Sequence, residues 1–177
     1  HIDAPIHFSA DGQTVAEIPV ENLVVPLCIV DVREGAHANS DYQVTPEDLK
    51  VYMAKHGPIP NKACVAMLSG WSAKVGTDGF RNVGDDGKMH FPGFHIEATQ
   101  MLLEETGAVG MAVDTLSLDY GPSGDFVTHS AWLPTSCRRL ENLANLEALP
   151  PAGATRVVGA PKHRDGTGGP TRIFAMS

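Results

Sequence analysis

The chain has 177 residues, of which 42% are hydrophobic and 19% are charged, and its formal net charge at pH 7 is −8. This length and composition are typical of one globular domain with a sizeable core, and they are unlike those of a disordered chain. The negative charge argues against a nucleic-acid-binding surface, which needs clustered Lys and Arg. No apolar run reaches the roughly 20 residues of a membrane-spanning helix. We therefore expect a single domain over residues 1–177 with neither nucleic acid nor a membrane as its partner.

The first element carries two histidines and a carboxylate within the sequence HIDAPIH. In an extended strand His1 and Asp3 project from the same face, because side chains alternate between the two faces. A nitrogen and an oxygen donor on one face suit a divalent cation such as Zn²⁺ or Mn²⁺. Pro5 makes a clean continuation of the strand doubtful, so His7 is expected beside the metal without binding it. A polar strand end with surface histidines is the alternative.

Apolar, β-branched runs predict further strands over residues 24–32, 63–68, 109–113, 156–158 and 173–176. One helix is predicted over 45–57, where Thr45 is the N-cap, Pro46 occupies the first helical position and Gly57 ends it. A second is predicted from about 95 to 105, before Gly107. The glycine-rich stretch 69–93 reads as a long loop, and such loops are often functional. The alternation predicts an α/β domain with mixed sheets and outer helices.

The three cysteines, Cys28, Cys64 and Cys137, show no C-x-x-C spacing. Cys28 and Cys64 lie in apolar runs, where a reduced buried thiol is the usual state. Cys137 is a candidate nucleophile of lowered pKa, but no other feature of the sequence requires one. The pattern favours a reducing, cytoplasmic setting.

The motif HIDAPIHF resembles the second half of the signature H-x-G-T-H-x-D-x-P-x-H-F, which belongs to the cyclase-like metal hydrolases, the family of isatin hydrolase and bacterial kynurenine formamidase. The resemblance continues through FPGF at 91–94, DTLSLD at 114–119, His129, Glu141-Asn142 and the glycine-rich stretch 166–170. It implies the swivelling β/β/α fold. The family pattern has another histidine four residues before the position of His1, so we expect that the N-terminal part of the protein is missing here.

The resemblance implies that His1, Asp3, His129 and Glu141 are the metal ligands, with Asp3 and Glu141 able to bridge two ions. Without it, His129 would be taken as a structural or surface histidine and Glu141 as a helix-surface acid. A divalent cation with an open position polarises a carbonyl and lowers the pKa of bound water to about 7. His7 is the candidate general acid or base, because imidazole titrates near neutrality.

Aromatic residues near the glycine-rich loop are candidates for the substrate pocket. Trp71 follows a predicted strand and can stack on a flat ring or belong to the core. Phe91 and Phe94 flank a Pro-Gly turn and are predicted to line the pocket. Asp114 and Asp119 frame the end of another strand. Two carboxylates five residues apart can be ligands, but we interpret them as capping and turn residues.

Two rival functions come from other classes. A non-haem iron oxygenase also uses two histidines and one carboxylate, and Arg139 falls ten residues after His129, where such enzymes can carry a co-substrate-binding arginine. The helix signals between strands argue against its double-stranded β-helix, and Glu141 would have no role. A metal-stabilised module without catalytic activity is the other rival.

The resemblance favours hydrolysis of a cyclic or aryl amide C–N bond, with the opening of isatin to isatinate as the preferred reaction and N-formylkynurenine as the alternative substrate. It implies Mn²⁺ or Zn²⁺ as the cofactor, a small aromatic amide or lactam as the partner, and a homodimer or larger homo-oligomer.

Overall fold

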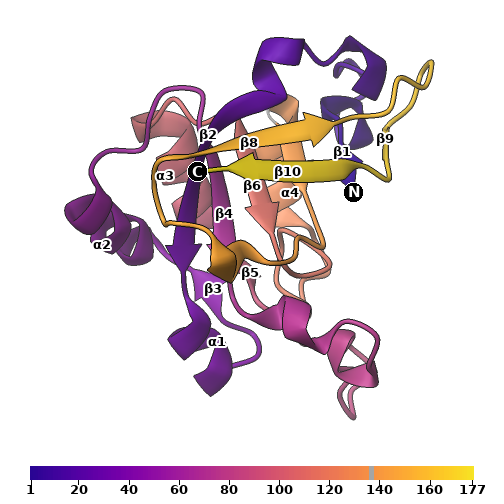
Figure 1. Cartoon of the computed structure of the whole chain (residues 1–177). Helices are drawn as coiled ribbons and strands as arrows, with labels where there is room; N and C mark the ends of the chain where they lie inside the picture. Colours follow the sequence, from indigo (N-terminus) through magenta and orange to yellow (C-terminus); the bar gives the residue numbers. More distant parts are fainter. Residues whose placement is uncertain (136–137) are drawn as a thin grey trace.

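The computed structural model describes residues 1–135 and 138–177, and four parallel strands form its centre (Figure 1). These strands are β2 (Val24–Asp31), β4 (Cys64–Leu68), β6 (Gly110–Val113) and β7 (Arg138–Leu140), adjacent in that order. All five residues of β4 and all four of β6 are buried. Strands covered on both faces read as continuous apolar runs, which explains why their pattern was visible in the sequence.

Antiparallel strands extend this sheet at both edges. Beside β2 lie β8 (Ala154–Gly159) and then β10 (Arg172–Met176), whereas β1 (Ile2–Asp3) and then β9 (Gly168–Gly169) follow β7. A separate pair of parallel strands consists of β3 (Gln43–Val44) and β5 (Gly93–Phe94). The N-terminal strand is therefore far from the next strand in sequence, β2, and lies against segments from the second half of the chain.

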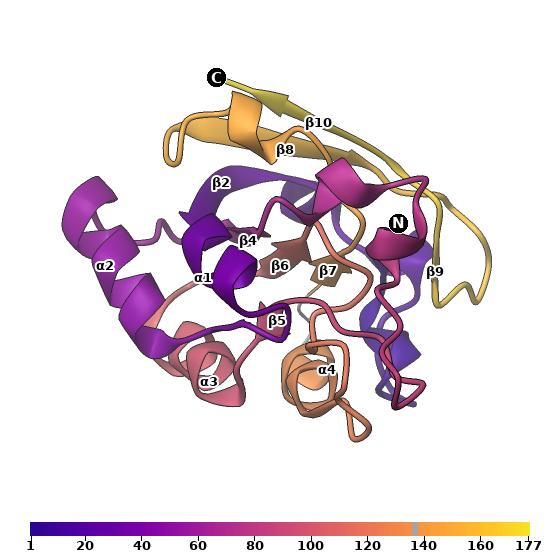
Figure 2. The same ribbon diagram turned by 90° about the horizontal axis from the view of Figure 1, so that it is seen from below.

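The helices lie on one side of the central strands, whereas β8 and β10 curl over the other side (Figure 2). The α-helices are α1 (Arg33–Ala38), α2 (Pro46–His56), α3 (Ile96–Glu105) and α4 (Val127–Trp132). Short 3₁₀ helices occur at Pro5–His7, Val15–Glu17, Val20–Asn22, Trp71–Lys74, Asp78–Phe80, Leu133–Thr135 and Leu146–Ala148. This arrangement confirms the predicted α/β class, the mixed sheet with outer helices, and the β/β/α layering.

Two apolar clusters fill the spaces on either side of the central sheet. Alternate residues of one strand belong to different clusters: Val65 and Met67 pack on the helix side, and Cys64 and Ala66 pack on the β8 side. This division follows from the two-residue period of a strand. The sheet is thus held in register from both faces, which fixes the positions of the side chains at its edge.

Both predicted helices are confirmed. Thr45 caps α2 by accepting a hydrogen bond from the Asp48 backbone N–H, and Gly57 ends it with a φ of 87°. The stretch 69–93 is mostly irregular. It contains two short 3₁₀ helices and an isolated bridge between Val83 and Met89, and β5 begins at its last residue. The sequence analysis did not predict α1 and α4, each of only six residues. Helices of that length contain too few turns to show a period.

Cys28 and Cys64 are free and buried, as predicted, whereas Cys137 lies outside the described residues. Among the described residues, no helix combines the length and the apolar character that crossing a membrane requires.

Candidate metal centre

Strand β1 and the residue before it place Asp3 and His1 on one face of the sheet edge. The strand pairs with β7 on one side and with β9 on the other, and Ile2 between the two polar residues is buried in the core. The imidazole Nε2 of His1 lies 3.0 Å from Oδ2 of Asp3. The prediction that this alternation brings both side chains together is therefore confirmed.

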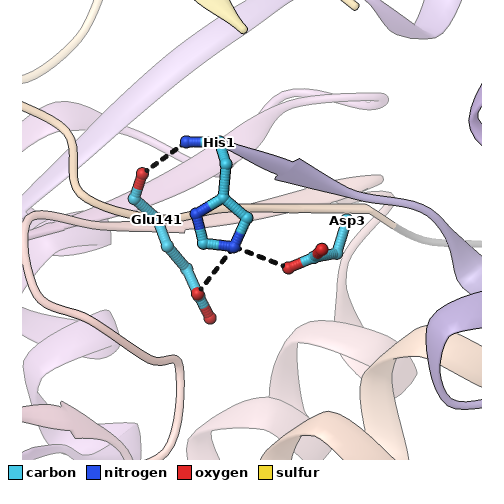
Figure 3. A group of neighbouring side chains, drawn as sticks. All are labelled: His1, Asp3 and Glu141. Carbon is cyan, nitrogen blue, oxygen red and sulfur yellow. Dashed lines mark hydrogen bonds and ion pairs between the residues drawn. The ribbon is translucent and has the colours of Figure 1, made fainter. Parts of the chain in front are cut away.

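Glu141 reaches the same point from the end of β7. The backbone N–H of Glu141 donates to the His1 carbonyl at 3.2 Å, and the backbone nitrogen of His1 donates to the Glu141 carbonyl at 3.1 Å. This pairing places Oε2 of Glu141 3.1 Å from Nε2 of His1. Figure 3 shows the imidazole between the two carboxylates. Ligand atoms from His1, Asp3 and Glu141 all lie within 4.8 Å of one another, which is a spacing that one cation can satisfy.

His129 faces this group from α4 on the opposite side of Glu141. Its Nε2 lies 3.4 Å from Oε1 of Glu141, and its side chain is only 3% exposed. The structure thus brings His129 to Glu141, but the three-residue group within 4.8 Å does not include it. Of the four predicted ligands, His1, Asp3 and Glu141 form this group, and His129 lies next to Glu141 outside it.

Asp119 fixes the orientation of His129. Its Oδ2 is hydrogen-bonded to Nδ1 of His129, so that Nε2 is the nitrogen directed towards Glu141. The same carboxylate accepts hydrogen bonds from the backbone N–H groups of Thr128, at 2.9 Å, and of His129, at 3.2 Å. Asp119 therefore caps the start of α4; the sequence analysis interpreted it as a capping or turn residue but did not predict this helix. The orienting contact with His129 was not foreseen, because it depends on a turn that folds residue 119 back onto residue 129.

Two glycines allow the chain to approach the centre closely. A Cβ on Gly168 would lie 2.3 Å from the Ile2 carbonyl oxygen and 2.6 Å from Oδ1 of Asp3. A Cβ on Gly93 would lie 2.3 Å from the Tyr120 backbone nitrogen, next to Asp119. No side chain fits at either position. Gly168 of the GTGGP stretch and Gly93 of the FPGF stretch are thus explained by the packing of β9 and β5 around the site.

Arg139 belongs to this centre, although the sequence analysis did not assign it there. In the β1–β7 ladder it lies directly opposite Asp3, and its Nε donates to Oδ2 of Asp3 at 2.6 Å. The same Nε is 3.4 Å from Oε1 of Glu141. The signal was present as the alternation Arg-Leu-Glu at 139–141, which complements His-Ile-Asp at 1–3, but recognising it requires knowing that the two strands pair.

The charges of the centre shift the pKa values of its members. Hydrogen bonds to Asp3 and then Glu141 raise the pKa of His1 from 6.5 to about 9. Burial opposes ionisation of Asp3, but the hydrogen bond with His1 and the charge of Arg139 outweigh it and lower the pKa of this carboxyl. Burial raises the pKa of Asp119 above its ordinary value. Nε2 of His1 thus faces an oxygen of each carboxylate, and these are the donor atoms that a cation would share.

A cavity of about 430 Å³ opens beside the centre. Its walls combine the polar residues of the site with aromatic rings, and they include His7, Phe8, Phe91, Phe126, His129, Arg139 and Glu141. The ring of Phe8 lies 5.0 Å from that of His129 and 6.1 Å from that of Phe126, measured between centroids. His7 is exposed at the end of the 3₁₀ helix that follows β1, because the strand ends before Pro5 as anticipated.

The predicted aromatic residues are not all at this cavity. Phe91 lines it, whereas Phe94 is 1% exposed in the helix-side core and does not. Trp71 lines a different cavity, where Nζ of Lys74 lies 3.1 Å above its ring and its Nε1 donates to the Phe80 carbonyl. The hydrophobic signal alone cannot separate a pocket wall from core. Phe8 and Phe126 replace Trp71 and Phe94 as the aromatic neighbours of the centre.

Comparisons with known proteins define the class. The family described as "Putative cyclase" matches residues 1–120. Isatin hydrolase of Roseibium aggregatum is 31% identical over 186 residues, which covers 99% of this chain and 70% of the relative. Kynurenine formamidase of Salinibacter ruber is 28% identical over 151 residues, covering 85% of this chain and 62% of the relative.

A solved structure of isatin hydrolase A from Labrenzia aggregata bound to benzyl benzoate superposes with a TM-score of 0.93 and 34% identity, over 98% of this chain and 70% of that one. The protein is a hydrolase of the α/β class with a carboxylate–imidazole centre at one sheet edge. It belongs to the cyclase family. The oxygenase alternative is wrong, since neither the family nor the mixed sheet with helices on one side matches a double-stranded β-helix.

Proposed function

We propose that the protein is a metal-dependent hydrolase that cleaves a cyclic or aryl amide C–N bond, with isatin as the favoured substrate and isatinate as the product. The observation that carries the proposal is the convergence of His1, Asp3 and Glu141 beside an aromatic-walled cavity. The similarity to isatin hydrolase over 99% of the chain supports the choice of substrate.

The donor set fits a divalent cation. Nε2 of His1 lies within 3.1 Å of an oxygen of each carboxylate, and the Asp3 and Glu141 side chains are 7% and 4% exposed. Two buried carboxylates with one imidazole offer the mixed oxygen and nitrogen donors that Zn²⁺ and Mn²⁺ accept. Bound there, the cation supplies Lewis acidity that polarises a carbonyl and lowers the pKa of a water ligand. His1, Asp3 and Glu141 would hold it, and His129 would complete the set from the far side of Glu141.

The remaining residues bind the substrate and move its proton. Phe8, Phe91 and Phe126 offer flat apolar surfaces for a fused aromatic ring. In the hydrolysis, the water oxygen forms a bond with the carbonyl carbon, the C–N bond breaks, and the leaving nitrogen takes up a proton. His7 lines the same cavity and is exposed, so its imidazole can deliver that proton and exchange it with solvent.

N-formylkynurenine is the second candidate substrate, because kynurenine formamidase of Salinibacter ruber is also similar to this chain. Both substrates are aryl amides that place a ring next to the scissile bond. The cavity volume of about 430 Å³ accommodates either, so the two are separated by assay.

The test compares hydrolysis of isatin and N-formylkynurenine by chelator-treated protein and by protein reloaded with Mn²⁺ or Zn²⁺. We expect activity only after reloading, and a higher kcat/KM for isatin. Asp3→Asn should abolish both metal binding and activity, whereas Asp11→Asn, at an exposed aspartate outside the centre, should retain them. If metal-loaded protein gains thermal stability but opens no lactam or N-formyl amide, it is a metal-stabilised module and the hydrolase proposal is refuted. Preference for N-formylkynurenine would refute only the substrate.

A further inference from the structure

Arg139 is the one group of the centre to which the proposed chemistry gives no role. It is 5% exposed, and no other described residue pairs with its Nη1 nitrogen. A buried guanidinium with an unsatisfied N–H is costly, and a buried ion pair is often no more stabilising than apolar packing of similar volume. Fold stability therefore does not explain why an arginine lies here.

The two oxygens of Glu141 face different neighbours. Oε2 lies 3.1 Å from Nε2 of His1, on the side of the three-residue group. Oε1 lies 3.4 Å from Nε2 of His129 and also 3.4 Å from Nε of Arg139. Glu141 can therefore contact two positive charges at once. Its Oε2 faces the place where His1 and Asp3 would hold a cation, and its Oε1 faces Arg139.

Asp3 contacts the same two sides, but through one oxygen atom. Its Oδ2 contacts Nε2 of His1 at 3.0 Å and Nε of Arg139 at 2.6 Å. A second cation would draw on Asp3, His129 and the Oε1 side of Glu141. Arg139 Nε already contacts two of these groups, Oδ2 of Asp3 at 2.6 Å and Oε1 of Glu141 at 3.4 Å, and His129 contacts the same Oε1. We propose that Arg139 is a built-in cation that holds Asp3 and Glu141 in place of a second metal ion and limits the centre to one divalent ion per chain.

The charge balance supports a single ion. With both histidines neutral, Asp3, Asp119, Glu141 and Arg139 sum to −2, because three carboxylates oppose one guanidinium. One divalent ion brings the buried group to zero. A second divalent ion would leave +2, within a few ångströms and largely out of solvent, where like charges repel strongly. An arginine cannot relieve this by losing its proton.

The register of the sheet fixes the position of Arg139 beside Asp3 and Glu141. Asp3 and Arg139 are partners in the antiparallel β1–β7 ladder, and Glu141 follows two residues later on the same face. The inference rests on the proposed metal dependence but not on any substrate. Metal counting therefore tests it separately from the hydrolase assignment.

The experiment measures Zn²⁺ bound per chain, by calorimetric titration and by elemental analysis after desalting. We compare the wild-type protein with Arg139→Met, which removes the charge at similar length, and with Arg139→Lys, which keeps it. Arg33→Met is the matched control, because Arg33 forms an exposed ion pair with Asp31. We expect one ion in the wild type, Arg139→Lys and Arg33→Met, and two in Arg139→Met. Adding His129→Ala to Arg139→Met should return the count to one.

Two tight ions in the wild-type protein, or one ion in a folded Arg139→Met variant, would overturn the proposal. Circular dichroism establishes whether Arg139→Met is folded. If it is not, the wild-type count still decides: one ion at saturating Zn²⁺ supports the proposal and two refute it. Absence of hydrolysis with every amide would leave the metal count, and hence this inference, unaffected.

Discussion

Replacing Asp119 with asparagine should separate the two roles of this carboxylate. Asp119 is 2% exposed and accepts hydrogen bonds from the Thr128 and His129 backbone N–H groups while also holding Nδ1 of His129. Asparagine keeps the size and one acceptor oxygen, but it loses the charge and the second acceptor. We therefore expect a weakened start of α4 and an imidazole that is no longer held in one orientation.

The magnitude follows from the bonds that are lost. A weakened helix cap costs about 0.5–2 kcal/mol. A buried hydrogen bond to a charged group adds about 1.5–3 kcal/mol. The sum, about 2–5 kcal/mol, corresponds to a Tm decrease of roughly 4–20 °C at 2–4 °C per kcal/mol for a protein of this size. Loss of an orienting partner behind a site histidine typically costs about 10–100-fold in metal affinity or activity.

Asp114→Asn is the matched control. Asp114 is 1% exposed, and burial raises its pKa as it does that of Asp119. Its carboxylate accepts from the Ser69 hydroxyl and from the Ser69 and Trp71 N–H groups, away from His129. Calorimetry should show that both variants are destabilised, and kcat/KM measured well below both Tm values should fall only in Asp119→Asn. Equal losses of activity would refute the orienting role.

The other predictions concern His7, His1 and assembly. His7→Ala should lower kcat by about 10²–10⁴-fold with unchanged metal content, as expected for a proton carrier, and loss of metal would instead make His7 a ligand. Because the folded-state pKa of His1, about 9, exceeds its ordinary value of 6.5, its ion pairs stabilise the metal-free protein fully below pH 6.5 and less as pH rises through 9. Urea titrations at both ends of this pH range should show that the free energy of unfolding decreases in the wild type and decreases less in His1→Gln. An equal decrease in both proteins would contradict the prediction. Light scattering at micromolar concentration should give a homo-oligomer, and a monomer would refute that expectation.

The sequence by itself determined the elements whose information is local. The runs that became β2, β4 and β6 are apolar because both faces of these strands are covered, and α2 begins at Thr45 and ends at Gly57 because cap and stop residues act within one turn. The alternation of His1 and Asp3 also sufficed to place both on one face. Six-residue helices and two-residue strands left no such signal, which is why α1, α4 and most of the short strands were absent from the prediction.

Only the tertiary structure decided what surrounds the centre. The place of Arg139 opposite Asp3 depends on pairing between residues 136 positions apart, and no local pattern encodes that register. The separation of Phe91 from Phe94 and Trp71 likewise depends on which buried rings face a cavity and which face the core. A hydrophobic side chain is expected to be buried, but long-range packing determines which residues surround it.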